Sequence, residues 1–406
     1  MRYRALPDFR DFYPEEMATR RWVERAWHRA SHEAGFAEID GPVLEPLELL
    51  TAKSGDEITQ QLYVFSDKAD RQVALRPEMT PTLARMVGAR AAALPKPIKW
   101  YSVPQFFRYE KPQRGRGREF IQWNVDVVGS AERAADAEAV AVALRALEML
   151  GIGAGDVVVR LNDRSFVSRL LRGLDVSEAE EPAVLACVDK LERDERAAGR
   201  LAELLGEPRA AEIRAWCERF PAERADELGP LLEALADFGL ADWVEPAFGV
   251  VRGLAYYTGP VWEIFDRARK LRSVAGGGRY DGLIAELGGP PLEALGFGMG
   301  DIVLGELLRD LGRLPEAPPR AEVFVVPIGA EMLGAARQVL ARLRQRGLSA
   351  DSPYTALRVG RALKAADAAG ARRAVLVGAD EWADGCVRVK ELASGDERVV
   401  RLDELD

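Results

Sequence analysis

The sequence has little histidine, little cysteine and no long apolar run. Its 406 residues include two histidines, His28 and His32, and three widely spaced cysteines. An odd number of distant cysteines favours reduced thiols in a cytoplasmic protein over a disulfide framework. No run of about 20 apolar residues is present, so we expect no membrane-spanning helix. Because histidine is so scarce, we expect no metal site at His28 and His32 and no catalysis by a histidine general base.

Lysine is scarce as well, although arginine is not. Of 56 Lys and Arg residues, nine are Lys and 47 are Arg, and the guanidinium group holds phosphate oxygens with a rigid planar fork. The 65 Asp and Glu residues give a formal net charge of −9. This charge excludes a uniformly basic coat for nucleic acid but allows a local basic patch. The length suggests two or three domains.

The alternation of strand-like and helical segments divides the chain. Strand-like runs occupy residues 1–165 and return over residues 244–312, and their hairpins favour an α+β fold with an antiparallel sheet. The clearest runs are residues 62–65, 72–75, 98–109, 119–129 and 157–161. Residues 166–243 are rich in Ala, Glu, Leu and Arg and hold no strand-like run. We therefore predict an inserted helical domain over residues 166–243.

A proline-rich segment marks the last boundary. Residues 313–320 hold three prolines in eight positions, which is typical of a stiff linker. Beyond it, a strand at 322–327 and another at 374–378 enclose two helical segments. This order predicts a small α/β domain over residues 321–406 with a largely parallel sheet.

An arginine-rich loop lies between two of the strand-like runs. In the segment FRYEKPQRGRGREF (107–120), Arg108 follows a strand, and Arg114, Arg116 and Arg118 alternate with glycines. Glycine allows close approach of the backbone, and arginine favours phosphate. We interpret this loop as a site for a polyphosphate or a nucleic-acid backbone; the alternative is a solvated basic hairpin tip.

Four further segments combine glycine with aromatic or charged residues. They are LRPEMT (75–80), VRGLAYYTG (251–259), GGGRYDG (276–282) and GFGMG (296–300). Adjacent tyrosines suit a small polar pocket, and runs of glycine suggest close approach of a ligand to the backbone. Each segment also has a plain structural explanation: a helix start, an aromatic strand face, a glycine-rich turn, or a strand on which something flat packs.

Taken in this order, the segments resemble histidyl-tRNA synthetases, a family of class II aminoacyl-tRNA synthetases. The resemblance extends over nearly the whole chain. It includes LRPEMT, the motif 2 segment FRYEKPQ…GREFIQ, and two histidine-specific signatures, RGLAYYTG and AGGGRYDGL. Residues 360–371 and 374–391 resemble the anticodon-binding domain of the same family.

The resemblance implies a role for each of several residues. It implies Arg252 and Arg108 as the catalytic cations. For histidine it implies Glu78, Thr80, Gln122, Asp126, Tyr256, Tyr257 and Tyr280. For ATP it implies Arg108, Glu110, Arg116, Arg118, Gly298 and Gly300. For the acceptor end of tRNA it implies Gln113 and Arg114.

The resemblance also implies the fold, the ligands and the partners. The expected fold is α+β, with a class II catalytic domain, its helical insertion and a C-terminal α/β anticodon-binding domain. ATP is expected as a substrate, with Mg²⁺. The expected partners are histidine, tRNA(His) and a second copy of the chain in a homodimer, with neither DNA nor a membrane.

One departure from the family pattern leaves a second function open. Class II motif 3 normally ends in an arginine that binds ATP, and the matching position here is Val303. A valine cannot donate to a phosphate, and Arg309 and Arg313 lie downstream. The main hypothesis is a histidine–tRNA ligase. The alternative is a paralogue that senses histidine as a regulatory subunit of ATP phosphoribosyltransferase, although such regulators usually lack the tail domain.

Overall fold

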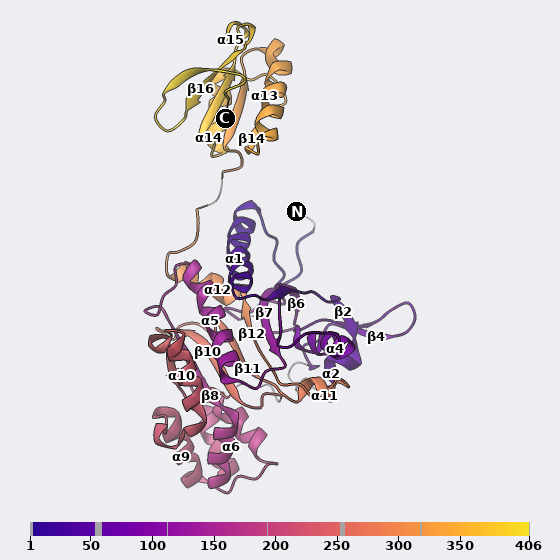
Figure 1. Cartoon of the computed structure of the whole chain (residues 1–406), viewed down its shortest axis with the longest axis vertical. Helices are drawn as coiled ribbons and strands as arrows, with labels where there is room; N and C mark the ends of the chain where they lie inside the picture. The colour runs from indigo at the N-terminus through magenta and orange to yellow at the C-terminus, as the bar shows by residue number, and fades with distance from the viewer. Residues whose placement is uncertain are drawn as a thin grey trace. The chain divides into compact units, whose positions relative to one another are not determined.

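The computed structural model describes residues 3–52, 59–111, 113–192, 194–251, 256–316 and 319–405. The chain forms two compact units, Met1–Pro315 and Glu316–Asp406, and each is described by itself (Figure 1). Among the helices within these ranges, none is long and apolar enough to cross a membrane.

A nine-stranded sheet forms the centre of the first unit, in the order β1-β5-β7-β12-β11-β10-β8-β9, with β6 paired to β7. The strands are β1 (Ala37–Glu38), β5 (Ile98–Ser102), β6 (Gln105–Phe107), β7 (Glu119–Val128), β8 (Val157–Asp163), β9 (Val244–Pro246), β10 (Pro260–Asp266), β11 (Ala275–Arg279) and β12 (Ala294–Gly300). The inner pairs are antiparallel, as predicted, but the edge pairs β1–β5 and β8–β9 are parallel.

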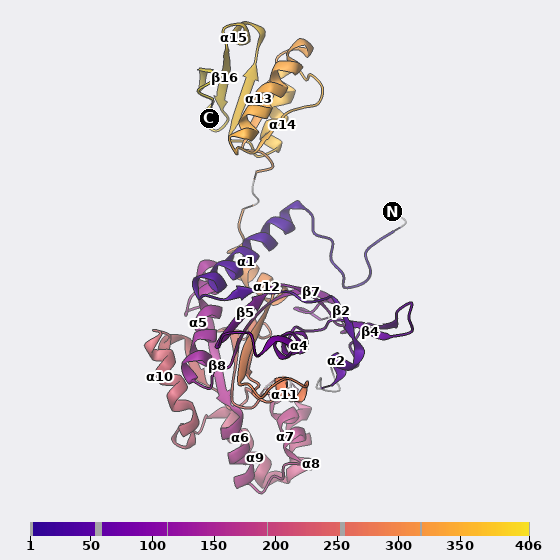
Figure 2. The same cartoon turned by 45° about the vertical axis from the view of Figure 1, so that its right-hand side comes forward.

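Helices cover both faces of this sheet (Figure 2). The helices of the sheet region are α1 (Pro14–Glu33), α4 (Thr80–Arg90), α5 (Arg133–Met149), α11 (Leu283–Glu286) and α12 (Asp301–Asp310). The main core lies between the sheet, α1 and α5, where the rings of Trp27 and Trp123 stack with centroids 6.1 Å apart. Helices α4 and α11 pack on the opposite face, which also carries the candidate site.

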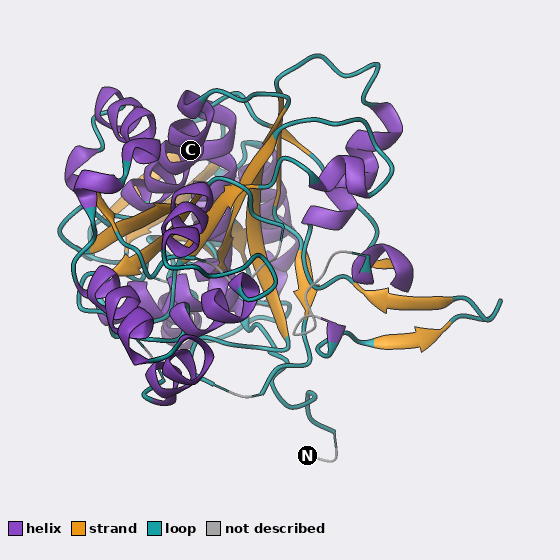
Figure 3. Cartoon of the chain, turned by 90° about the horizontal axis from the view of Figure 1, so that it is seen from below, coloured by secondary structure: helices purple, strands orange, loops and turns teal. Residues whose placement is uncertain are grey.

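A small three-stranded sheet stands beside the large one. It consists of β2 (Leu44–Pro46), β4 (Gln72–Leu75) and β3 (Val64–Ser66), all antiparallel, with α2 (Leu47–Thr51) following β2. The β3–β4 hairpin extends away from the rest of the unit (Figure 1 and Figure 3). Its position agrees with the hairpin expected from residues 62–75.

The segment expected to be helical, residues 166–243, holds helices joined by turns and no strand among its described residues. It holds α6 (Arg164–Gly173), α7 (Glu181–Val188), α8 (Arg196–Leu205), α9 (Glu207–Glu218), α10 (Gly229–Asp237) and the short 3-10 turns Ala222–Arg224, Asp226–Leu228 and Ala241–Trp243. Helices α6 to α9 share a core of their own, which includes Phe166, Leu201 and Trp216. Helix α10 instead packs on α5 through Leu231 and Leu235, as part of the main core.

The second unit is a five-stranded mixed sheet in the order β14-β13-β15-β16-β17. Its strands are β13 (Val323–Pro327), β14 (Ala350–Asp351), β15 (Arg373–Val377), β16 (Cys386–Glu391) and β17 (Glu397–Arg401). Its helices are α13 (Leu333–Gln345), α14 (Val359–Ala368) and α15 (Ala379–Ala383), with a 3-10 turn at Ala330–Met332.

Alternation along β13 explains how this unit packs. Val323 and Val325 face α13, whereas Phe324 and Val326 face α14. The expectation of a largely parallel sheet is wrong, because β16 and β17 add an antiparallel hairpin to the three parallel strands.

Candidate active site

The alternation of side chains along β7 separates core from site. Ile121, Trp123 and Val125 belong to the main core, so Gln122 and Asp126 point to the opposite face of the sheet. Gln122 lines a cavity there, and Asp126 is buried beside Tyr280. One strand therefore supplies two of the residues expected to bind histidine.

The neighbouring strands β11 and β12 carry glycine on this same face. Gly276 lies opposite Gly298 in the ladder, and Gly278 lies opposite Gly296. A Cβ atom added at Gly296 would lie 2.1 Å from Oδ1 of Asp126, and one at Gly298 would lie 2.1 Å from Nε2 of Gln122. Side chains of neighbouring strands fill the space that these glycines leave open. We call these four glycines the glycine floor.

The segment 276–278 was open to two interpretations, and the structure decides between them. It is part of strand β11 rather than a glycine-rich turn. The floor-facing glycines Gly276 and Gly278 alternate with Gly277, whose added Cβ would lie 2.5 Å from Cβ of Phe297 on the core side. A Cβ atom added at Gly278 would lie 2.7 Å from the carbonyl oxygen of Pro260, so close packing within the sheet requires glycine at both 277 and 278.

A buried acid and three tyrosines lie at one end of the floor. The hydroxyl of Tyr280 lies 2.5 Å from Oδ1 of Asp126. Burial raises the pKa of Asp126 to about 7, although the hydrogen bond from Tyr280 acts to lower that pKa. The rings of Tyr256 and Tyr280 meet edge to face at 5.9 Å, and Tyr257 packs against Tyr256 at 5.0 Å. This arrangement can hold a small ring with polar atoms.

Glu78 lies at the edge of the tyrosine group. It is buried at the end of LRPEMT, and its Oε2 accepts a hydrogen bond from the Tyr256 hydroxyl at 3.2 Å. Thr80 begins helix α4 two residues later. The structure thus brings a carboxylate to the group that Asp126, Tyr256, Tyr257 and Tyr280 form, which we call the tyrosine cluster.

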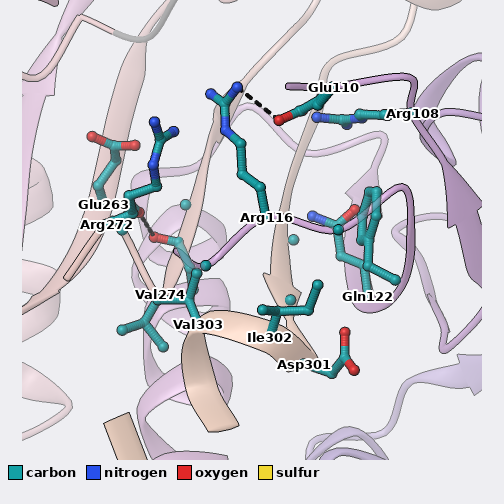
Figure 4. A pocket seen from close by; sticks show the side chains of 18 residues that line it. Arg108, Glu110, Arg116, Gln122, Glu263, Arg272, Val274, Asp301, Ile302 and Val303 are labelled. Carbon is teal, nitrogen blue, oxygen red and sulfur yellow. Dashed lines mark hydrogen bonds and ion pairs between the residues drawn. The ribbon is translucent and has the colours of Figure 1, made fainter. Parts of the chain in front are cut away.

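An adjacent cavity of about 270 Å³ is lined by arginine (Figure 4). Arg108, Arg116 and Arg272 line it together with Glu110 and Glu263. In Figure 4 the guanidinium groups lie on the upper side of the cavity, and Ile302 and Val303 of α12 lie on the lower side. The remaining lining residues include Phe120, Gln122, Gly276, Gly298 and Gly300.

Contacts hold two of these arginines in place. The Nε atom of Arg108 donates to the carbonyl oxygen of Pro77 at 2.9 Å, and the guanidinium lies 5.4 Å from the centre of the Phe120 ring. Arg116 pairs with Glu110 at 2.7 Å. A fixed guanidinium fork can meet phosphate oxygens without losing much conformational freedom on binding.

Three other residues expected at the site lie outside the tyrosine cluster and do not line the arginine-lined cavity. Arg118 lies over the Tyr109 ring at 4.1 Å and 3.4 Å from Asp8. Arg114 pairs with Glu306 and Asp310 of α12. The side chain of Gln113 accepts a hydrogen bond from Arg272.

Arg252, the expected catalytic cation, lies outside the described residues, as do its neighbours up to Ala255. Arg272 and Glu263 line the arginine cavity but were not predicted from the sequence. Arg272 belongs to a basic run, RARKLR, over residues 267–272, and such a run reads as a solvated surface. The only indication in the sequence that Arg272 belongs to the site is that it lies close to the signature AGGGRYDGL.

Arg279, within that same signature, has a structural role. Its Nη2 atom lies 2.5 Å from Oδ2 of Asp136 on helix α5, and both side chains are buried. The ion pair ties the end of β11 to α5 next to Tyr280. Burial raises the pKa of Asp136, although the Arg279 guanidinium acts to lower that pKa.

Comparisons with known proteins identify the family of the chain. A family model described as histidyl-tRNA synthetase matches residues 8–300, and one described as an anticodon-binding domain matches residues 322–406. The chain is 41% identical to a histidine–tRNA ligase of Opitutus terrae, with 97% of this chain and 94% of that protein covered. It is 38% identical to the chloroplastic/mitochondrial histidine–tRNA ligase of Arabidopsis thaliana, with 98% and 85% covered.

Solved structures show the same fold. The histidyl-tRNA synthetase of Nostoc superposes with a TM-score of 0.83 at 24% identity, with 99% of this chain and 98% of that chain covered. A Bacillus halodurans protein, described as an ATP phosphoribosyltransferase regulatory subunit/histidyl-tRNA synthetase, gives 0.70 at 19% identity, with 93% and 98% covered. The expected α+β fold and the resemblance to this family are confirmed, and the chain belongs to the histidyl-tRNA synthetase family.

Proposed function

We propose that the chain is a histidine–tRNA ligase, which activates histidine with ATP and transfers it to tRNA(His). The observation that carries this proposal is that strand β7 connects the arginine cavity with the tyrosine cluster. Gln122 lines the arginine cavity and Asp126 belongs to the tyrosine cluster; the two residues are four apart on one face of the strand and therefore about 13 Å apart. This span suits an amino acid whose carboxylate meets the α-phosphate of ATP.

The chemistry of activation suits a site without histidine. A carboxylate oxygen of histidine attacks the α-phosphorus, the bond to the bridging oxygen of the β-phosphate breaks, and pyrophosphate leaves. No proton has to be removed, so the site must position the reactants and stabilise charge. Arg108 is held by Pro77 at the cavity wall, and we assign it to the α-phosphate and the substrate carboxylate. Arg252 is proposed as the second cation.

The tyrosine cluster would recognise the histidine side chain. Tyr280 donates its one hydroxyl proton to Asp126, so the pair offers a carboxylate oxygen and a hydroxyl oxygen as neighbouring acceptors for the N–H groups of an imidazole. Glu78 and Thr80 would hold the α-amino group, with Gln122 nearby. The Tyr256 hydroxyl bonded to Glu78 fixes that carboxylate, and Tyr257 would complete the wall.

The arginine cavity would take ATP, as expected for Arg108, Glu110, Arg116, Gly298 and Gly300, which all line it. Mg²⁺ usually binds through one or two carboxylates together with substrate phosphates. Three carboxylates line the cavity, Glu110, Glu263 and Asp301, and they can supply the one or two that the ion needs. When bound, the ion would neutralise charge on the phosphates.

Three features suggest the partners of the chain: the second unit, the motif 2 loop and one exposed apolar surface. We propose that the second unit and the motif 2 loop residues Gln113 and Arg114 contact tRNA, and that the enzyme works in the cytoplasm. Val43, Leu44, Val64 and Phe65, in and beside the three-stranded sheet, are apolar and at least 40% exposed. Leu44 and Phe65 lie on one face of this sheet, opposite Leu75 and Val73 of β4, and exposed apolar side chains on one face support the homodimer, because they favour a protein partner.

The regulatory alternative rests on Val303 alone. The experiment that separates the two is histidine-dependent ATP–pyrophosphate exchange, followed by charging of tRNA(His) with radiolabelled histidine. We expect both activities from the purified chain. No exchange above background at millimolar ATP, together with co-purification of an ATP phosphoribosyltransferase, would favour the regulator instead.

A further inference from the structure

The motif 3 position, Val303, supplies no cation to the cavity that we propose binds ATP. Val303 lies in the first turn of α12 and lines the cavity, but its side chain has no hydrogen-bond donor. The triphosphate of ATP carries its highest charge density on the β- and γ-phosphates. A site that binds ATP through this cavity therefore needs another cation near Val303.

The two arginines downstream of Val303 are engaged elsewhere. Nη1 of Arg309 lies 2.8 Å from Glu306, and its side chain is 60% exposed. Arg313 pairs with Asp156 at 2.6 Å, at the end of α12 away from the cavity. Neither arginine lines the cavity.

Arg272 occupies the required place. It lies in the loop between β10 and β11, and it lines both the ATP cavity and a neighbouring cavity of about 440 Å³, as Gly115 and Val303 do. A Cβ atom built on Gly115 would lie 3.2 Å from Cγ2 of Val303 and 4.0 Å from Cδ of Arg272. The two side chains therefore converge on one point beside the motif 2 loop, although they are far apart in sequence.

A side chain of the motif 2 loop also orients this arginine. Nη2 of Arg272 donates to Oε1 of Gln113 at 2.5 Å. A guanidinium has five N–H donors in a planar fork, which suits two-pronged contact with phosphate oxygens. Figure 4 shows Arg272 and Arg116 with their guanidinium groups on the same side of the cavity, above Val303.

We propose that Arg272 binds the β- and γ-phosphates of ATP and so takes the place of an arginine at position 303. The inference rests on the proposed function, because it assumes that the arginine cavity takes ATP. It adds that a loop of the sheet, rather than helix α12, supplies the cation. The same loop would make ATP binding depend on the motif 2 loop, through Gln113.

The test compares binding of ATP with binding of AMP, which lacks the β- and γ-phosphates, by calorimetry on the full chain. For Arg272→Ala we expect a 10- to 100-fold weaker affinity for ATP and an affinity for AMP within twofold of the parent. Arg272→Lys keeps the charge but loses the fork, and it should bind ATP with an intermediate affinity. Arg309→Ala is the matched control, and it should bind both nucleotides as the parent does.

Rescue gives a second and independent readout. The double variant R272A/V303R places an arginine at the motif 3 position, and it should recover most of the affinity for ATP. ATP affinity of Arg272→Ala within twofold of the parent, or equal losses for ATP and AMP, would overturn the proposal. A loss confined to tRNA charging would also overturn it and would place Arg272 at the acceptor end of tRNA.

These measurements do not depend on turnover. If the parent chain binds ATP but shows no exchange, the proposed function fails while the assignment of Arg272 is still decided by the ATP and AMP affinities. If the parent shows exchange and Arg272→Ala has an unchanged KM for ATP, the ligase function stands and the assignment of Arg272 fails.

Discussion

The hydroxyl of Tyr280 lies 2.5 Å from Oδ1 of Asp126, and both side chains are buried at the closed end of the glycine floor. Burial raises the pKa of Asp126 to about 7. An unfolded chain would ionise the same carboxyl near its ordinary pKa of about 4. Between these two values the folded protein binds more protons than the unfolded one, so this group destabilises the fold as pH rises.

Asp126→Asn removes that titration and therefore changes how stability depends on pH. The free energy of unfolding of the variant, relative to the parent, should increase by about 2–3 kcal/mol between pH 5 and pH 8. Thermal melts of both proteins across that range measure the difference. A difference that is constant with pH would show that Asp126 has an ordinary pKa. The variant should also have a higher KM for histidine.

Arg108→Lys tests whether the planar fork matters at the α-phosphate. The lysine keeps the charge but cannot reproduce both the bond to the Pro77 carbonyl and a two-pronged contact with phosphate. We expect kcat for exchange to fall by about 100-fold or more. Arg29→Lys, at an exposed ion pair on α1, is the matched control and should keep full activity. Equal rates for the two variants would remove Arg108 from the reaction.

Arg252→Ala tests the second proposed cation. Because phosphoryl chemistry depends on stabilising charge in the transition state, exchange should fall by about 100-fold or more, while histidine binding stays measurable by calorimetry. Arg196→Ala, on the exposed side of α8, serves as the control. Unchanged exchange in Arg252→Ala would mean that the catalytic cation lies elsewhere.

Gly277→Ala tests the packing between β11 and β12. The added methyl group would lie 2.4 Å from the carbonyl oxygen of Gly296 and 2.5 Å from Cβ of Phe297. The backbone must move to make room, at a cost of about 3 kcal/mol, and the melting temperature should fall by several degrees. Gly155→Ala meets no atom within 4 Å and should melt as the parent does. Equal melting temperatures would contradict this account of β11.

The sequence predicted those strands in which apolar and polar side chains alternate. The runs at 98–109 and 119–129 became β5, β6 and β7. Strand β11 gave no such signal, because consecutive glycines have no side chains to show a period of two. Its extended state comes from pairing, since Gly277 lies opposite both Trp262 of β10 and Phe297 of β12.

Site residues could be predicted where they belong to a distinctive sequence motif. They could not be predicted where a residue comes close to the site only because the chain folds. Tyr280, Asp126 and Glu78 followed from the resemblance, and the structure brings them together in or beside the tyrosine cluster. Arg272 did not, because nothing in a basic run indicates which of its members faces Val303. The hairpin of β16 and β17 was missed as well, because its outer strand is exposed and charged.

The glycine floor has a consequence for redesign of substrate range. A side chain added at Gly296 or Gly298 would enter space already occupied by Asp126 or Gln122, so neither position can be varied without disturbing a residue that we propose binds histidine. Histidine analogues with larger or differently shaped rings would therefore have to be accommodated from the sides. Libraries that vary Tyr256, Tyr257 and Tyr280, and keep the four glycines fixed, are the ones that we expect to yield folded enzymes with altered amino-acid preference.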